Sequence, residues 1–196
     1  MNQAPPLITH EAFPNEILAM IFEEHAILEW WAPAIDGRVC RLWRQIVLNT
    51  PRAWSYLDVS CYERKQPGIG ELCLWLHRSG AASLHVSVNR DFILDGCING
   101  RTLYDVLGGC HARIASLQMT WGNTLFFEGR DFPCLNLLVV KNWAQAHFSS
   151  SLDRWGPMPE LRSLRLGHIP SSMVPLNTLA SLGVLVLHDT TLTSLP

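Results

Sequence analysis

Two hydrophobic patterns follow each other along the 196-residue chain. Up to about residue 54, apolar positions recur at the helical period, which is typical of helices with one buried face. Beyond that point they alternate within short runs, as in strands with one buried face. The change of period predicts an N-terminal helical module followed by an α/β region.

The helical part begins at Pro14, because proline is tolerated at the start of a helix, where an N–H has no partner. The apolar spacing after it predicts one helix of about three turns. A second helix is predicted over residues 34–48, with Gly37 as a weak point that costs about 1 kcal/mol relative to alanine. Pro51 lies beyond its end. The apolar positions of the two helices are Ile17, Leu18, Ile21, Phe22, Ile35, Val39, Trp43, Ile46 and Val47.

A short motif then recurs, in which an apolar residue is followed by two residues, an apolar residue, one residue and another apolar residue. Its copies lie at 54–59, 81–86, 114–119, 135–140, 161–166 and 182–187, and their central leucines are 27, 33, 21, 26 and 21 residues apart. Leucine-rich repeats have a similar core and run about 20–29 residues. A leucine-rich α/β chain produces some such matches by chance, but six in order favour an irregular parallel solenoid.

The connections between copies also carry signals. Leu72, Trp75 and Leu76 predict a helix that ends at Gly80, a plausible C′ glycine. A second helical stripe runs from Leu103 to Cys110, and the later connections are short and rich in proline and glycine. The chain stops directly after the sixth copy, without a polar cap. We therefore expect either a piece of a longer protein or an end that packs against something else.

Residues 13–54 resemble the F-box, and the whole arrangement resembles fungal F-box proteins with degenerate leucine-rich-type repeats. The resemblance implies a three-helix F-box at 13–54 and a repeat domain at 55–196. We expect a disordered lead at 1–12 and, from the missing cap, a repeat domain that is truncated at its C-terminal end. Phe13 stands where the family usually has leucine, and 24–36 departs more strongly. The residues that carry the likeness are Pro14-Asn15-Glu16-Ile17-Leu18, Ile21-Phe22, Val39-Cys40-Arg41, Trp43-Arg44, Pro51 and Trp54-x-x-Leu57.

In that family a small Skp-type adaptor grips the F-box, a cullin scaffold brings the ubiquitin-transfer machinery, and the repeats bind the target. The resemblance thus implies the substrate-recognition subunit of an SCF-type ubiquitin ligase. The implied adaptor contacts are Pro14, Ile17, Leu18, Ile21, Val39, Cys40 and Trp43. For Phe22, Ile46, Val47 and Trp54 we instead expect packing against the repeat domain.

Two other functions remain open. The first is a leucine-rich-type interaction module with a degenerate F-box and no ligase role. The second is an enzyme of unrecognised type, although no Gly-x-Ser-x-Gly, phosphate loop or paired carboxylates support it. His188-Asp189 lacks a serine elbow, so a surface turn is expected there. We therefore expect no enzymatic activity, no catalytic or metal-binding residues and no cofactor. The eight tryptophans are expected to be core and edge residues rather than a ligand cage, although three near repeat edges could line a binding surface: Trp121, Trp143 and Trp155.

Composition further limits the partners and the cellular location that can be expected. The chain is 48% hydrophobic and 16% charged with a formal charge of −2, which offers no basis for binding nucleic acid or an anionic membrane. It has no apolar run of the length a membrane span needs and no signal peptide, so a cytoplasmic or nuclear location is expected. The six cysteines include no Cys-x-x-Cys pair. They are expected to be buried, reduced thiols rather than zinc ligands.

Overall fold

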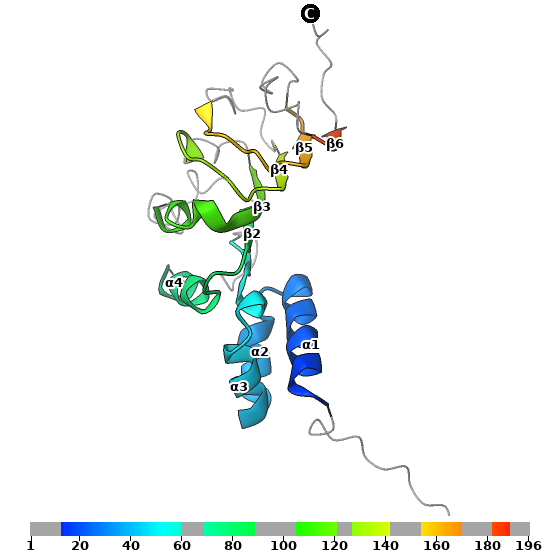
Figure 1. Ribbon diagram of the computed structural model, residues 1–196, viewed down its shortest axis with the longest axis vertical. Helices are drawn as coiled ribbons and strands as arrows, with labels where there is room; N and C mark the ends of the chain where they lie inside the picture. Colours follow the sequence, from blue (N-terminus) through cyan, green and yellow to red (C-terminus); the bar gives the residue numbers. More distant parts are fainter. Residues whose placement is uncertain are drawn as a thin grey trace, which may run out of the picture.

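The computed structural model describes residues 13–59, 69–88, 105–120, 127–141, 154–169 and 182–188. The expected disordered lead at 1–12 lies outside these residues. A group of helices occupies one end of the molecule, and a six-stranded sheet extends from it (Figure 1). The protein is thus a mixed α/β protein with a parallel sheet, as the sequence predicts.

The helical end consists of α1 (Asn15–Leu28), α2 (Ala32–Val39), α3 (Arg41–Leu48) and the 3-10 turn η2 (Pro51–Trp54). Pro14 directly precedes α1, and its carbonyl accepts the N–H groups of Ile17 and Leu18. With 14 residues, α1 makes about four turns, one more than the apolar spacing indicates.

The prediction of one helix over 34–48 is wrong. The chain is fully extended at Cys40, with φ −156° and ψ 175°, which separates α2 from α3. Cys40 caps α3, because its Sγ accepts the N–H of Trp43 at 3.4 Å. Gly37 does not break the helix and lies buried inside α2. The backbone break thus comes from a capping residue rather than from the residue with the lowest helix propensity.

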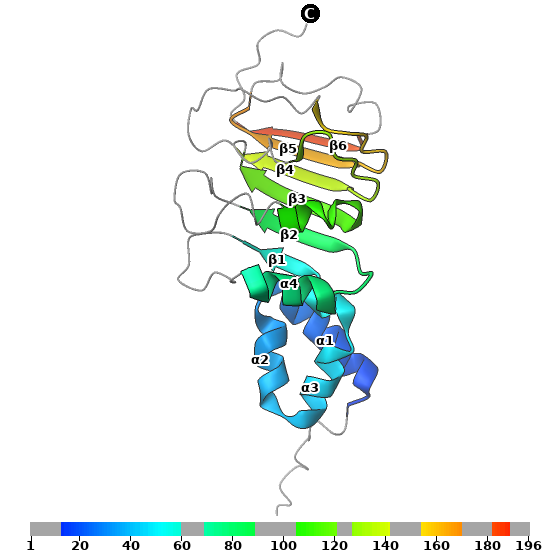
Figure 2. The ribbon, with the colours of Figure 1, turned by 90° about the vertical axis from the view of Figure 1, so that its left-hand side faces the viewer.

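Each of the six motif copies contains one strand. The strands are β1 (Tyr56–Asp58), β2 (Leu84–Val88), β3 (Ile114–Thr120), β4 (Leu137–Lys141), β5 (Ser163–Gly167) and β6 (Val184–His188). They pair in parallel and in chain order, β1 to β6 (Figure 2). The sequence therefore locates every strand of the described sheet.

The alignment of the second copy is wrong by two residues. Leu57 pairs with Val86 rather than with Leu84, and Val86 pairs with Leu117. The pairing of β2 with β3 also shifts by one residue, because Leu84 pairs with Ile114 whereas His85 pairs with Ser116. Because side chains alternate between the two faces of a strand, an alignment error of two residues keeps the same side chains on the buried face. The error therefore did not disturb the pattern that located the strand.

The described connections lie on one side of the sheet (Figure 1). They comprise α4 (Ile69–Arg78), a helical turn at 105–108, η3 (His111–Arg113) and turns within 127–136 and 154–162. Gly80 follows α4 with φ +52°, the left-handed conformation expected of a C′ glycine. These connections cover the apolar face of the sheet, where Val86, Leu117, Leu138 and Leu164 are buried.

A tryptophan cluster joins the helical module to the sheet. Trp54 is 1% exposed, donates its Nε1–H to the Val47 carbonyl at 2.8 Å, and lies 5.1 Å from the ring of Trp75 on α4. The Trp75 ring is in turn 5.7 Å from Trp30. The stretch that departs from the F-box pattern thus supplies part of this joint. Phe22, Ile46, Val47 and Trp54 all belong to the continuous core, and the expected packing beyond the helical module is confirmed for Trp54, which contacts Trp75 on α4.

Four cysteines lie in the described residues, and all four are free thiols. The expectation that they are buried is not met in full by any of the four. Cys40 and Cys110 are partly buried, and Cys73 and Cys134 are exposed because they lie on the outer side of α4 and in a turn. Cys61 and Cys97 are outside the described residues. Among the described helices, none combines the length and the apolar character needed to cross a bilayer.

Candidate interaction surfaces

The helix α1 is apolar on two opposite faces. Leu18, Phe22 and Ala26 are buried against the rest of the module. On the other side, Ile17 and Ile21 are 41% and 47% exposed. A surface helix ordinarily presents polar side chains to water on the face that does not pack. The outward face of α1, defined by Ile17, Met20 and Ile21, is therefore an apolar surface that is not covered within the described residues.

The residues implied as adaptor contacts separate into two groups. Pro14, Ile17, Ile21 and Val39 are exposed, and Cys40 is partly buried. They lie on α1 and at the C-terminal end of α2, two helices that contact each other.

Leu18 requires a correction, because it is only 3% exposed and belongs to the core. It cannot contact a partner without opening the module. Trp43 is partly buried, and its ring packs 5.0 Å from that of Phe22. Its main contacts are therefore within the fold. A helical stripe does not distinguish the inner from the outer face when both are apolar.

The sheet has an open face, defined as the side opposite the connections. The strand register places its side chains in rows that cross the strands. One row, the central row, consists of Asp58, Ser87, Gln118, Val139, Arg165 and Val186. A neighbouring row consists of Tyr56, His85, Ser116, Leu137, Ser163 and Val184.

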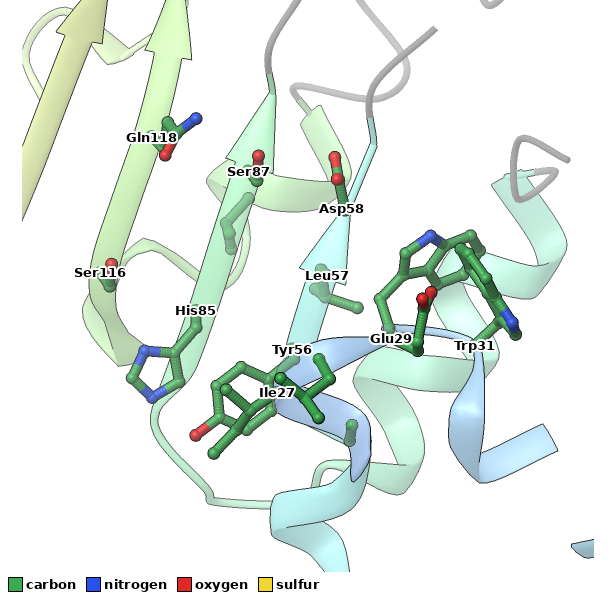
Figure 3. Close-up of a pocket in the computed structure, with 14 residues that line it drawn as sticks. Ile27, Glu29, Trp31, Tyr56, Leu57, Asp58, His85, Ser87, Ser116 and Gln118 are labelled. Atoms are coloured by element: carbon green, nitrogen blue, oxygen red, sulfur yellow. The ribbon is translucent and has the colours of Figure 1, made fainter. Parts of the chain in front are cut away.

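At the β1 end of the open face lies a cavity of about 350 Å³, which we call the acidic pocket. One wall is the segment 26–31, and the floor comes from β1, β2 and β3 (Figure 3). Glu29 and Asp58 are the carboxylates that line it, and no lysine or arginine does so within the described residues. The pocket also contains the parallel-stacked rings of Tyr56 and His85, with centroids 4.6 Å apart.

The electrostatics of this pocket follow from burial and neighbouring acids. Burial raises the pKa of Tyr56, and the carboxylates of Glu24 and Glu23 raise it further against the opposing effect of Arg52. Burial lowers the pKa of His85, which favours its neutral form. The described lining therefore combines a neutral tyrosine, a histidine biased toward its neutral form and two carboxylates.

Near the β6 end of the same face lies a second cavity of about 300 Å³, which we call the basic pocket. Its charged or titratable side chains are those of Lys141, Arg165, His168 and His188, and the described lining includes no carboxylate. His168 has a left-handed backbone with φ 56° at the end of β5. The two pockets share Gln118 and thus form one surface with opposite charge at its two ends.

Sequence reasoning missed these residues, although their positions carried a signal. Asp58, His85, Gln118 and Arg165 occupy positions that alternate with the buried residues of their strands. Their assembly into one surface depends on strand pairing between residues far apart in the chain.

Of the three tryptophans that could line a surface, Trp155 instead belongs to the core beneath the sheet. It is buried against Phe127 and Phe132, which confirms the favoured prediction of core packing. Trp121 and Trp143 are outside the described residues. His188 ends β6 instead of lying in a surface turn.

Among the residues that the structure describes, no group of three or more His, Cys, Asp or Glu side chains is arranged to hold a metal ion. No protein-family model, curated protein or solved structure matches the chain.

Proposed function

We propose that this protein is the substrate-recognition subunit of an SCF-type ubiquitin ligase. Its helical module binds a Skp-type adaptor, which links it to a cullin scaffold. The open face of its repeat-like sheet binds the target protein. The protein contributes binding surfaces and no catalytic residues, because the associated machinery transfers ubiquitin.

The observation that carries this proposal is the apolar outward face of α1. Ile17, Met20 and Ile21 are 41%, 61% and 47% exposed, although the opposite face of the helix is fully packed. Val39, the last residue of α2, is also an exposed apolar side chain, at 59%. Apolar side chains gathered on a surface indicate a protein interface. Their positions within residues 13–54 coincide with the part of the chain that resembles the F-box.

The tryptophan joint supports the second half of the proposal. A ligase must hold its target at a constant position relative to the transfer machinery. Trp54 and Trp75 pack edge to face at 5.1 Å, and the Arg78 guanidinium lies 4.3 Å from the Trp54 ring centroid. A buried aromatic joint of this kind resists bending between the adaptor-binding helices and the target-binding sheet.

Co-expression with a Skp-type adaptor tests the proposal. We expect the wild-type chain to co-purify with the adaptor and the Ile17→Asp variant to lose it, because the carboxylate would be desolvated in the interface without a partner. Leu74→Asp is the matched control: Leu74 lies on α4 and is also 41% exposed. Its substitution should leave adaptor binding intact.

Circular dichroism of each variant separates loss of binding from loss of fold. An Ile17→Asp chain that keeps its helical signal but not its adaptor supports the proposal. Wild-type protein that binds no adaptor at micromolar concentration overturns the ligase role and leaves a leucine-rich-type interaction module with a degenerate F-box.

A further inference from the structure

The open face carries its charges in a definite order across the strands. In the central row, the carboxylate of Asp58 on β1 is followed by Ser87, Gln118 and Val139, and then by the guanidinium of Arg165 on β5. Glu29 adds a second carboxylate in the acidic pocket, and Lys141 at the end of β4 adds a second cation in the basic pocket. A partner that crosses this face therefore meets carboxylates near one end and cations near the other.

The distance between these ends follows from the sheet. Asp58 and Arg165 are four strand steps apart in register, which is roughly 19 Å at about 4.8 Å per step. An extended peptide rises about 3.3 Å per residue, so it covers this distance in about six residues. The residues between the charged ends are small, neutral or apolar, and they leave a track without competing charge.

We infer that the open face binds an extended segment of the target that carries a basic side chain and an acidic side chain about six residues apart. The basic side chain enters the acidic pocket, between Glu29, Asp58 and the stacked rings of Tyr56 and His85. The acidic side chain lies over Lys141 and Arg165. This inference rests on the proposed role of the open face in binding the target.

The shape of the acidic pocket favours a peptide segment over a second copy of this chain. The segment 26–31 forms a wall beside the strands, and Leu28 on it is 80% exposed. A flat protein face cannot reach past such a wall into the cavity, whereas one long side chain can. Aromatic faces and carboxylates together are the environment that favours a lysine or arginine side chain.

Selection from a displayed library of random 12-residue peptides on the 196-residue chain tests the inference. We expect enriched peptides to carry a Lys or Arg and an Asp or Glu five to seven positions apart, in one consistent order. A synthetic copy of an enriched peptide should bind at least tenfold more weakly to Arg165→Glu and to Glu29→Lys. Its affinity for the wild type should also fall as salt is added.

Matched charge reversals away from the face are the controls. Arg41→Glu lies on α3 and Glu71→Lys on α4, and both positions are exposed. Arg41→Glu changes the net charge by the same amount as Arg165→Glu, and Glu71→Lys by the same amount as Glu29→Lys. Each control should leave peptide affinity within twofold. Equal loss in controls and face variants would mean that net charge alone drives binding, which overturns the inference.

The remaining outcomes separate this inference from the proposed function. Enrichment without the spaced charge pair overturns the inference and leaves the open face as a binding surface. No enrichment overturns both the inference and target binding by this face, while adaptor binding is still judged by co-purification. Light scattering that shows a dimer, converted to monomer by Arg165→Glu, would make a second copy the occupant and overturn the inference.

Discussion

His25 on α1 holds Asp36 on α2 through its Nδ1 atom, which lies 3.2 Å from both carboxylate oxygens. Asp36 is 4% exposed, and burial raises its pKa while the neighbouring His25 acts in the opposite direction. The pair therefore joins the first two helices of the module through a carboxylate that is costly to bury alone.

Removing the imidazole should destabilise the protein. His25→Ala leaves the Asp36 carboxylate without this contact, so we expect the free energy of unfolding to fall by about 2 kcal/mol in urea denaturation at neutral pH. His77→Ala is the control, because His77 is exposed on α4. Equal stability of the two variants would show that the His25–Asp36 contact contributes nothing.

Asp36 should also make stability depend on pH. Because its pKa is raised in the folded state, the folded protein binds this proton more tightly than the unfolded chain. Its contribution to stability is therefore largest below the ordinary aspartate pKa and is lost as pH rises through the folded pKa. Asp36→Asn removes this dependence.

Urea denaturation across this pH range provides the measurement. The stability of Asp36→Asn relative to wild type should increase as pH rises from about 3.9. A relative stability that decreases with pH would mean that the attraction of His25 outweighs burial.

Cys40 should behave as a replaceable cap. Cys40→Ser keeps a side-chain acceptor for the Trp43 N–H and substitutes a stronger N-cap, so stability should be unchanged or higher by up to about 1 kcal/mol. Cys40→Ala removes the acceptor and should cost about 1 kcal/mol. Thermal denaturation followed by circular dichroism compares the three proteins, and an alanine variant as stable as the serine variant would contradict the capping role.

Trp54 should be the most sensitive single residue of the joint. Trp54→Ala leaves a large cavity beside Trp75 and should cost about 3–5 kcal/mol in chemical denaturation. Trp54→Phe should cost much less, because the Val47 carbonyl that loses the indole bond still accepts the Thr50 N–H at 3.2 Å. Phe13→Ala, at a residue that is 44% exposed, should change stability by less than about 0.5 kcal/mol.

Arg113, directly before β3, forms hydrogen bonds with the connection that follows α4. Its guanidinium donates to the Ala82 carbonyl at 3.2 and 2.9 Å and to the buried Ser79 hydroxyl at 2.8 Å. Arg113→Ala should lower the free energy of unfolding by about 2 kcal/mol, because these acceptors lose their donor. Arg113→Lys should recover only part of this loss, since an ammonium cannot reproduce the planar fork. Full recovery by lysine would contradict the importance of the paired geometry.

The positions of the strands and the start and end signals of several elements could be predicted from the amino-acid sequence. Alternation of apolar residues is a local property, so it located all the described strands without knowledge of their partners. The helix start at Pro14 and the helix end at Gly80 could also be predicted, because each role depends on the backbone conformation of that residue itself. The resemblance of residues 13–54 to the F-box also rests on a short contiguous stretch, and it stays a prediction.

Which apolar side chains remain exposed could not be predicted, because it depends on packing between elements. Ile17 and Leu18 are neighbours in the same apolar stripe, yet one is 41% exposed and the other 3%, because packing against α2, α3 and η2 buries just one side of α1. The helix break at Cys40 could not be predicted either, because it depends on the turn that packs α3 against α2. The open face with its two charged ends exists only through strand register, which places Asp58 and Arg165 in one row although 107 residues separate them.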